Sequence, residues 1–165
     1  MIDKLASYFS VKLKEEDGRY RFGIGKMSGE DVILLQPLTF MNRSGDVVGE
    51  LLRYYKVLPN DLIIIYDDID LNPGQLRVKV KGGSGGHRGC ASVIASIGTE
   101  DFLRIRIGIG RPDAGHYLHD IAYYVLSEFT RDEKPVMEEA IEDATEAVRM
   151  IVGNDTTGAM NKFNQ

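Results

Sequence analysis

The stretch LIIIYDDIDLNPGQLRVKVKGGSGGHRG, residues 62–89, contains two different strand patterns followed by a glycine-rich loop. Residues 62–66 are a continuous apolar run, which is typical of a strand that is buried on both faces. Residues 75–81 instead alternate, with apolar side chains on one face and basic side chains on the other. We therefore expect two strands, the first buried inside a sheet, and then a loop that leads into a helix.

Helices and strands interleave along the rest of the chain. The apolar spacing predicts helices at about 2–9, 41–55, 90–97 and 134–152 and further strands at 19–26, 32–37 and 102–110. Because the two types alternate, we expect the α/β class. The length of 165 residues is that of one ordinary domain, so we expect a single globular domain over residues 1–165.

The composition is that of a globular protein, with 43% apolar and 27% charged residues. No apolar run approaches the roughly 18–20 residues that a membrane span needs, and the first residues lack the pattern of a secretory signal. The single cysteine, Cys90, excludes an internal disulfide and a cysteine-based zinc site. We therefore expect a reduced, cytoplasmic compartment and no membrane partner.

Charge is unevenly distributed along the chain. The net charge is −5, yet residues 74–111 hold seven basic and two acidic side chains, a balance of +5. A basic stripe on an acidic protein fits a local anion site better than general binding to polyelectrolytes. Two solvated strand faces would give the same count, so charge alone leaves both interpretations open.

Polar side chains occur where sites are commonly built. Asp67 follows the buried strand, at the carboxyl end where α/β sheets place their sites, and is a candidate base or orienting group. A solvated turn is the alternative for Asp67, and it is the interpretation that we favour for Asp68 and Asp70. Asn42 could hold a water or a carbonyl, or it could cap the helix expected at 41–55.

The glycine loop matches neither common phosphate-binding pattern. No Gly-Lys-Ser/Thr follows it, and the pattern G-x-G-x-x-G counted from Gly83 ends on Arg88. Small residues that run into a helix still expose backbone N–H groups, which suit an anion or an oxyanion. His87 is then a candidate base, phosphate contact or structural hydrogen-bonding group. His116 and His119 lack the further ligands that a metal site needs.

No nucleophile elbow of the form G-x-S-x-G is present, and Cys90 fits a small core residue at the start of a helix. We therefore expect any chemistry to activate water directly, without a covalent intermediate and without a cofactor or metal.

Four motifs, taken in order, resemble the bacterial-type peptidyl-tRNA hydrolases. They are PLTFMNRSG (37–45), IIIYDDIDLNPGQLRVKVKGGSGGHRG (63–89), FLRIRIGIGRP (102–112) and YVLSEF (124–129). The resemblance runs from Met1 to about Ile151 and implies an α/β globule around a twisted mixed sheet flanked by helices. It also implies hydrolysis of the ester between a peptide and the ribose of tRNA, which recycles tRNA during translation. The implied partner is peptidyl-tRNA, and we expect a monomer with no obligate protein partner.

The resemblance implies roles for individual residues. Asn42 matches a site asparagine, and Asp67 matches the aspartate that orients a catalytic histidine. The residues that match the loop lining the active-site crevice are Gly85, Gly86 and His87. Lys79 and Arg106 match basic positions that look suited to tRNA phosphates.

The chain departs from the family pattern in two places. Family members begin with a strand, a G-N-P-G turn and an R-H-N-x-G-F run that carries the catalytic histidine, whereas Met1 resembles the helix after them. We therefore assign the catalytic histidine to no residue, and we expect a natural start upstream of Met1. We also expect these 165 residues to have impaired activity. The strands that would flank the missing strand should be left with unpaired backbone groups. Arg88 replaces a loop asparagine thought to hold the water, and it could serve as an anion contact instead.

Two other functions remain open from the sequence. One is a non-catalytic homologue that binds tRNA through Lys79 and Arg106 but has lost its base. The other is a generic nucleotide-binding α/β enzyme, against which the absence of both phosphate-loop patterns counts.

Overall fold

The structure is a computed structural model, and it describes residues 1–112 and 121–165. The helices are α1 (Ile2–Tyr8), α2 (Ser44–Tyr55), α3 (Arg88–Ile97), α4 (Ile121–Leu126), α5 (Glu133–Val152) and α6 (Thr156–Phe163). The strands are β1 (Lys14–Glu16), β2 (Tyr20–Met27), β3 (Glu30–Pro37), β4 (Ile63–Asp68), β5 (Leu76–Lys79) and β6 (Leu103–Gly108). Two 3₁₀ turns, η1 (Met41–Arg43) and η2 (Pro59–Asp61), precede α2 and β4. The α/β class is confirmed.

The strands form two sheets of three. β1, β2 and β3 are antiparallel neighbours in that order. The second sheet has the order β4-β6-β5, in which β6 runs parallel to β4 and antiparallel to β5. This second sheet is mixed as we expect, but β3 and β4 both lie at sheet edges, because no described strand pairs with both of them.

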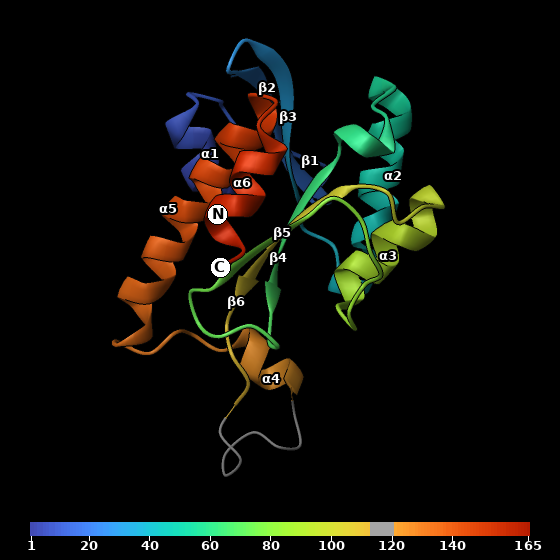
Figure 1. Ribbon diagram of the computed structural model, residues 1–165. Helices are drawn as coiled ribbons and strands as arrows, with labels where there is room; N and C mark the ends of the chain where they lie inside the picture. The colour runs from blue at the N-terminus through green and yellow to red at the C-terminus, as the bar shows by residue number, and fades with distance from the viewer. Residues whose placement is uncertain (113–120) are drawn as a thin grey trace.

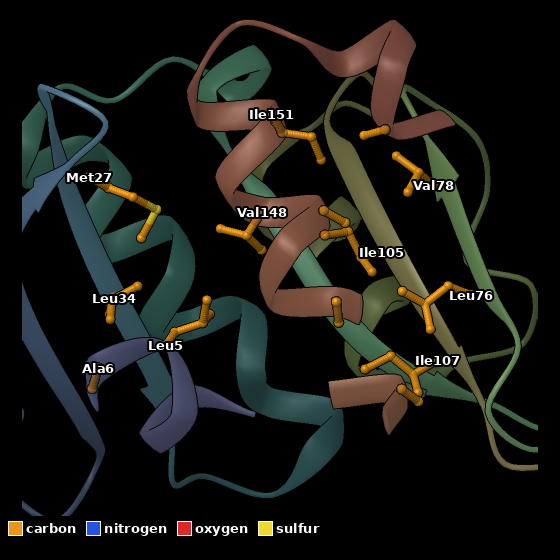
Figure 2. Packing of buried hydrophobic residues seen from close by; sticks show 14 of the residues in the cluster. Leu5, Ala6, Met27, Leu34, Leu76, Val78, Ile105, Ile107, Val148 and Ile151 are labelled. Carbon is orange, nitrogen blue, oxygen red and sulfur yellow. The ribbon is translucent and has the colours of Figure 1, made fainter. Parts of the chain in front are cut away.

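The mixed sheet lies between two helical layers (Figure 1), with α5 and α6 on one side and α2 and α3 on the other. Figure 2 shows Ile105 of β6 and Val148 of α5 among the buried side chains of the larger apolar cluster. Ile105 is fully buried, and burying such a side chain stabilises the fold by roughly 1.5–3 kcal/mol. The central strand of the sheet is thereby fixed, and with it the site at its edge. None of the described helices is long and apolar enough to cross a bilayer.

The second layer is held by close contact between α2 and α3. The backbone N–H of Gly45 donates to Ser92 Oγ at 2.9 Å, and a Cβ on Gly45 would lie 2.0 Å from the Ser92 carbonyl oxygen. Beneath this contact, Cys90 is buried in a smaller apolar cluster, as its position at a helix start predicts. The close approach brings η1 beside the first turn of α3.

The outer edge of β5 is covered by the end of the chain. Asn164 Oδ1 accepts a hydrogen bond from the Val78 N–H at 2.7 Å, and its Nδ2 donates to the Val78 carbonyl at 2.9 Å. This side chain replaces the backbone groups of a neighbouring strand, so Val78 keeps both of its hydrogen bonds at a sheet edge.

Sequence patterns missed β1, α4 and α6, which have three, six and eight residues. Segments of this length are too short to establish an apolar period. The sequence patterns also predicted that the strand beginning at residue 75 continues to residue 81, whereas β5 ends at Lys79 and Val80 is 48% exposed. The chain leaves the sheet there because Gly82 adopts a φ of +140°, which an L side chain rarely adopts.

The packing of α2 on α3 generates a stability prediction. Gly45→Ala should lower the free energy of unfolding by about 1–3 kcal/mol, because the new methyl group has to displace the backbone at Ser92. Urea denaturation measures this change. Gly83→Ala is the matched control, since a Cβ there would have its nearest contact at 3.7 Å, and it should leave stability nearly unchanged. Equal stability of the two variants would contradict the close packing.

Candidate functional site

Asp67 and His87 meet at the carboxyl end of β4. The Nε2 atom of His87 lies 3.5 Å from Asp67 Oδ1. Asp67 is in the strand itself, and His87 precedes α3 at the end of the glycine loop. The two side chains are 32% and 17% exposed, so both remain in reach of a ligand at the edge of the sheet.

His87 is also the cap of α3. Its Nδ1 accepts a hydrogen bond from the Cys90 backbone N–H at 3.1 Å. A nitrogen that accepts carries no proton, so a neutral His87 has its proton on Nε2, directed at Asp67. Both ring nitrogens are then engaged, and no lone pair is left to take a proton from water. The geometry therefore matches the structural option for His87 and not the role of base.

The carboxyl group of Asp67 is ionised at neutral pH. Burial raises the pKa of Asp67, but the hydrogen bond and the electrostatic interaction with His87 outweigh that effect, so the net pKa lies below the ordinary value. Among the described residues, no second side chain donates to this carboxylate. The backbone N–H of Asp67 itself donates the other hydrogen bond that lowers this pKa.

Tyr66 is a part of the site that the sequence did not single out. Its ring lies 4.6 Å from the His87 ring, centroid to centroid, and limits the positions of the imidazole. Burial, followed by the interaction with Cys90, raises the pKa of Tyr66 to about 12, so its hydroxyl stays protonated at neutral pH. The signal in the sequence was its place next to Asp67, at the end of an apolar run that otherwise lacks aromatic residues.

The glycine loop leaves open space beside this pair. Gly85 and Gly86 have φ values of +58° and +82°, and nothing lies within 4 Å of a Cβ built on either. A side chain would fit into this space, so crowding does not explain the glycines. The left-handed conformation of the backbone is what requires glycine here. The loop closes with the His87 N–H donating to the Ser84 carbonyl at 3.0 Å, which fixes the approach of His87 to Asp67.

Asn42 lies on η1, next to the first turn of α3. A Cβ on Gly89 would lie 2.5 Å from Met41 Sδ, so η1 contacts the helix that His87 caps. The Asn42 side chain is exposed and makes no hydrogen bond within the described residues. It does not cap η1 or α2, so the capping alternative for this residue is wrong.

The basic stripe divides into residues with different surroundings. Lys79 is exposed on β5. Arg104, opposite it on β6, is 1% exposed and stacks its guanidinium 4.0 Å from the centre of the Phe102 ring. Arg104 therefore cannot present its charge to a large ligand, and the stripe is smaller than the residue count suggested.

Asp68 is largely buried in β4 and bound to Arg106, so its assignment to a solvated turn is wrong. It is the last residue of β4, its side chain is 10% exposed, and its Oδ2 accepts a hydrogen bond from Arg106 Nε. Asp70, by contrast, is exposed and binds Arg111. The alternation along β4 places Asp68 on the face opposite Asp67, next to the basic residues of β6.

Three predicted positions add little to this geometry. Arg88 is exposed at the first residue of α3 and forms no ion pair within the described residues. His116 and His119 lie outside the described residues. In residues 1–112 and 121–165, no three histidine, cysteine or acidic side chains come together as a metal site would need.

Comparisons with known proteins agree over the whole chain. A family model described as peptidyl-tRNA hydrolase matches residues 1–165. The peptidyl-tRNA hydrolase of Geobacillus thermodenitrificans is 48% identical over 165 residues, which are all of this chain and 87% of that protein. The peptidyl-tRNA hydrolase of Bacillus subtilis is 42% identical over 99% of this chain and 86% of its own length. A crystal structure of peptidyl-tRNA hydrolase from Acinetobacter baumannii superposes with a TM-score of 0.90 at 35% identity, covering 99% of this chain and 82% of that one.

The pair of Asp67 and His87 generates a prediction on pH. Because the folded pKa of Asp67 lies below the ordinary 3.8, its ionised form stabilises the fold above that value, and this contribution is lost as pH falls through the folded pKa. Asp67→Asn should therefore be less stable than the parent chain at neutral pH, with a difference that shrinks below about pH 4. Urea denaturation over this range measures the difference.

The control for this prediction is the same comparison in a His87→Asn background, where asparagine can still cap α3. The pH dependence should be smaller there, because the donor to Asp67 is gone. A difference that stays constant from neutral pH to about pH 3 would contradict a lowered pKa.

Proposed function

The chain belongs to the peptidyl-tRNA hydrolase family, and we propose that it hydrolyses the ester between the peptide and the ribose of peptidyl-tRNA. The observation that carries this proposal is the family match over all 165 residues. The site supports it, because an ionised carboxylate and an open glycine loop lie together at the carboxyl end of β4.

The chemistry that we propose for this site is water attack on the ester. Asp67 orients the group that takes the proton from water, and Asn42 holds the water or the ester carbonyl through its neutral amide. The backbone beside Gly85 and Gly86 lines the path of the peptide and ribose. An ester needs no strong acid for its leaving group, so activation of one water and stabilisation of the oxyanion suffice.

The base itself is assigned to none of the 165 residues. His87 is the one histidine among the described residues, and both of its ring nitrogens are already engaged. The chain matches 87% of the length of the Geobacillus thermodenitrificans relative, so that protein has further residues beyond the match. We propose that the base of the reaction is a histidine outside the printed residues, and that residues 1–165 alone have impaired activity.

Recognition of tRNA is proposed for the basic face. Exposed Lys79 and partly exposed Arg106 would contact phosphates, which gives affinity without dependence on the tRNA sequence. Arg88 would add an anion contact at the start of α3. We further propose that the protein acts as a monomer in the cytoplasm. A purely tRNA-binding role is less favoured, because the relatives that match the whole chain are named as hydrolases.

The proposed source of the base is tested by two forms of the protein. Residues 1–165 are compared with a form that carries the in-frame residues encoded upstream of Met1. The longer form should cleave peptidyl-tRNA at least roughly 100-fold faster, because general-base catalysis contributes about that much. Single-turnover release of tRNA measures the rate. Equal rates in the two forms would contradict the proposal and would return the search for the base to residues 1–165.

The role of Asp67 is tested in whichever form is active. Asp67→Asn should lower the single-turnover rate by roughly 100-fold, since the amide cannot hold the base by charge. Asp70→Asn is the matched control, because Asp70 is exposed and binds Arg111 outside the site, and it should keep the parent rate. Full activity of Asp67→Asn with an unchanged fold would refute the assigned role.

A further inference from the structure

Asp68 and Arg106 form a fixed ion pair on the face of the mixed sheet next to α3. Arg106 donates from Nε to Asp68 Oδ2, and the side chains are 21% and 10% exposed. The other oxygen of Asp68, Oδ1, accepts the backbone N–H of Asp70 at 2.8 Å. Because both oxygens are bound, the carboxylate has little freedom to move away from Arg106.

This carboxylate compensates a concentration of positive charge. Arg106 is paired with Arg77 across β6 and β5, and two like charges in direct opposition destabilise a sheet. Arg77 relieves part of that repulsion by donating from Nη1 to the Asn164 carbonyl at 2.9 Å. Among the described residues, Asp68 is the one carboxylate that forms an ion pair with a basic side chain of β5 or β6.

The form of the contact determines what Arg106 can still do. A guanidinium has five N–H donors in a rigid plane, and Asp68 uses the one on Nε. The terminal nitrogens of Arg106 have no partner within the described residues. An anion that approaches from solvent would therefore meet these nitrogens in a fixed orientation, but with much of their charge already balanced by Asp68.

We propose that Asp68 is a positioning residue that aims Arg106 at a tRNA phosphate and at the same time weakens its hold on that phosphate. The inference rests on the proposed function, in which Arg106 contacts tRNA. The physical reason for a weakened contact is that substrate and product tRNA carry the same phosphates. Tight binding of these phosphates would stabilise substrate and product equally, which slows release of the product without accelerating the chemical step.

Binding of deacylated tRNA tests the inference without requiring catalysis. Asp68→Asn in the full chain keeps the shape of the side chain and removes its charge. A unit charge about 7 Å from a phosphate in water changes the affinity roughly threefold, so Asp68→Asn should lower the Kd by about that factor. The dependence of log Kd on log salt should also become steeper, because Arg106 then acts as a full charge on the phosphate.

A double-mutant cycle separates this effect from a general change of net charge. Arg106→Gln should weaken binding more in the Asp68→Asn background than in the parent chain, since the pair acts as one unit. Asp61→Asn removes one negative charge on the exposed turn before β4 and should show no such coupling to Arg106→Gln. Asp68→Ser, which keeps an oxygen acceptor, is a second variant in case Asp68→Asn lowers stability.

The possible outcomes distinguish the inference from the proposed function. Tighter binding in either Asp68 variant, coupled to Arg106→Gln, supports the inference. Unchanged or weaker binding in both folded Asp68 variants, while Arg106→Gln still weakens the parent, overturns the inference alone. No effect of Arg106→Gln in any background contradicts the phosphate contact itself, and it overturns the proposed tRNA face together with the inference.

Discussion

The site depends on one imidazole that is bound on both sides. His87 accepts the Cys90 N–H in the first turn of α3 through Nδ1 and directs Nε2 at Asp67, which is at the end of β4. A helix start and a strand end are thereby joined by a single side chain whose tautomer is fixed. The lowered pKa of Asp67 follows from this arrangement, since the donor that holds the carboxylate also stabilises its charge against the cost of burial.

The rest of the fold holds the end of β4 and the start of α3 in fixed positions relative to each other. The central strand β6 is anchored by α5 on one face, and α3 is pressed against α2 on the other through contacts too close for any side chain on Gly45. This packing sets η1, with Asn42, against the first turn of α3. The glycine loop has to pass between β5 and α3 in a short distance, and its left-handed residues make that path possible.

The sequence predicted the parts of the structure that have a strong local pattern. The apolar run of β4 and the alternation of β5 and β6 are visible as patterns, and so is the amphipathic stripe of α5. The end of β4, which the sequence predicted to be buried, then pointed to Asp67, and the loop pointed to His87; β4 is instead a half-buried edge strand. Asp68 was assigned wrongly because a sequence shows no partner for it. Only the parallel pairing of β4 with β6 brings it beside Arg106, 38 residues later. Tyr66 was overlooked and Arg104 was counted in the basic stripe for the same reason, since burial and stacking are set by tertiary contacts. The two-sheet arrangement also lay beyond local patterns, because strand pairing is a long-range property.

The tautomer of His87 tests this account most directly, because the lowered pKa of Asp67 and the exclusion of His87 as the base both follow from it. Long-range ¹H–¹⁵N correlation spectra of the ¹⁵N-labelled chain, assigned by comparison with His87→Asn, distinguish a protonated from an unprotonated ring nitrogen. At a pH where the ring is neutral, the account predicts a proton on Nε2 and an accepting Nδ1. A neutral ring with its proton on Nδ1 would contradict it, since α3 would then lose its cap and Asp67 its donor.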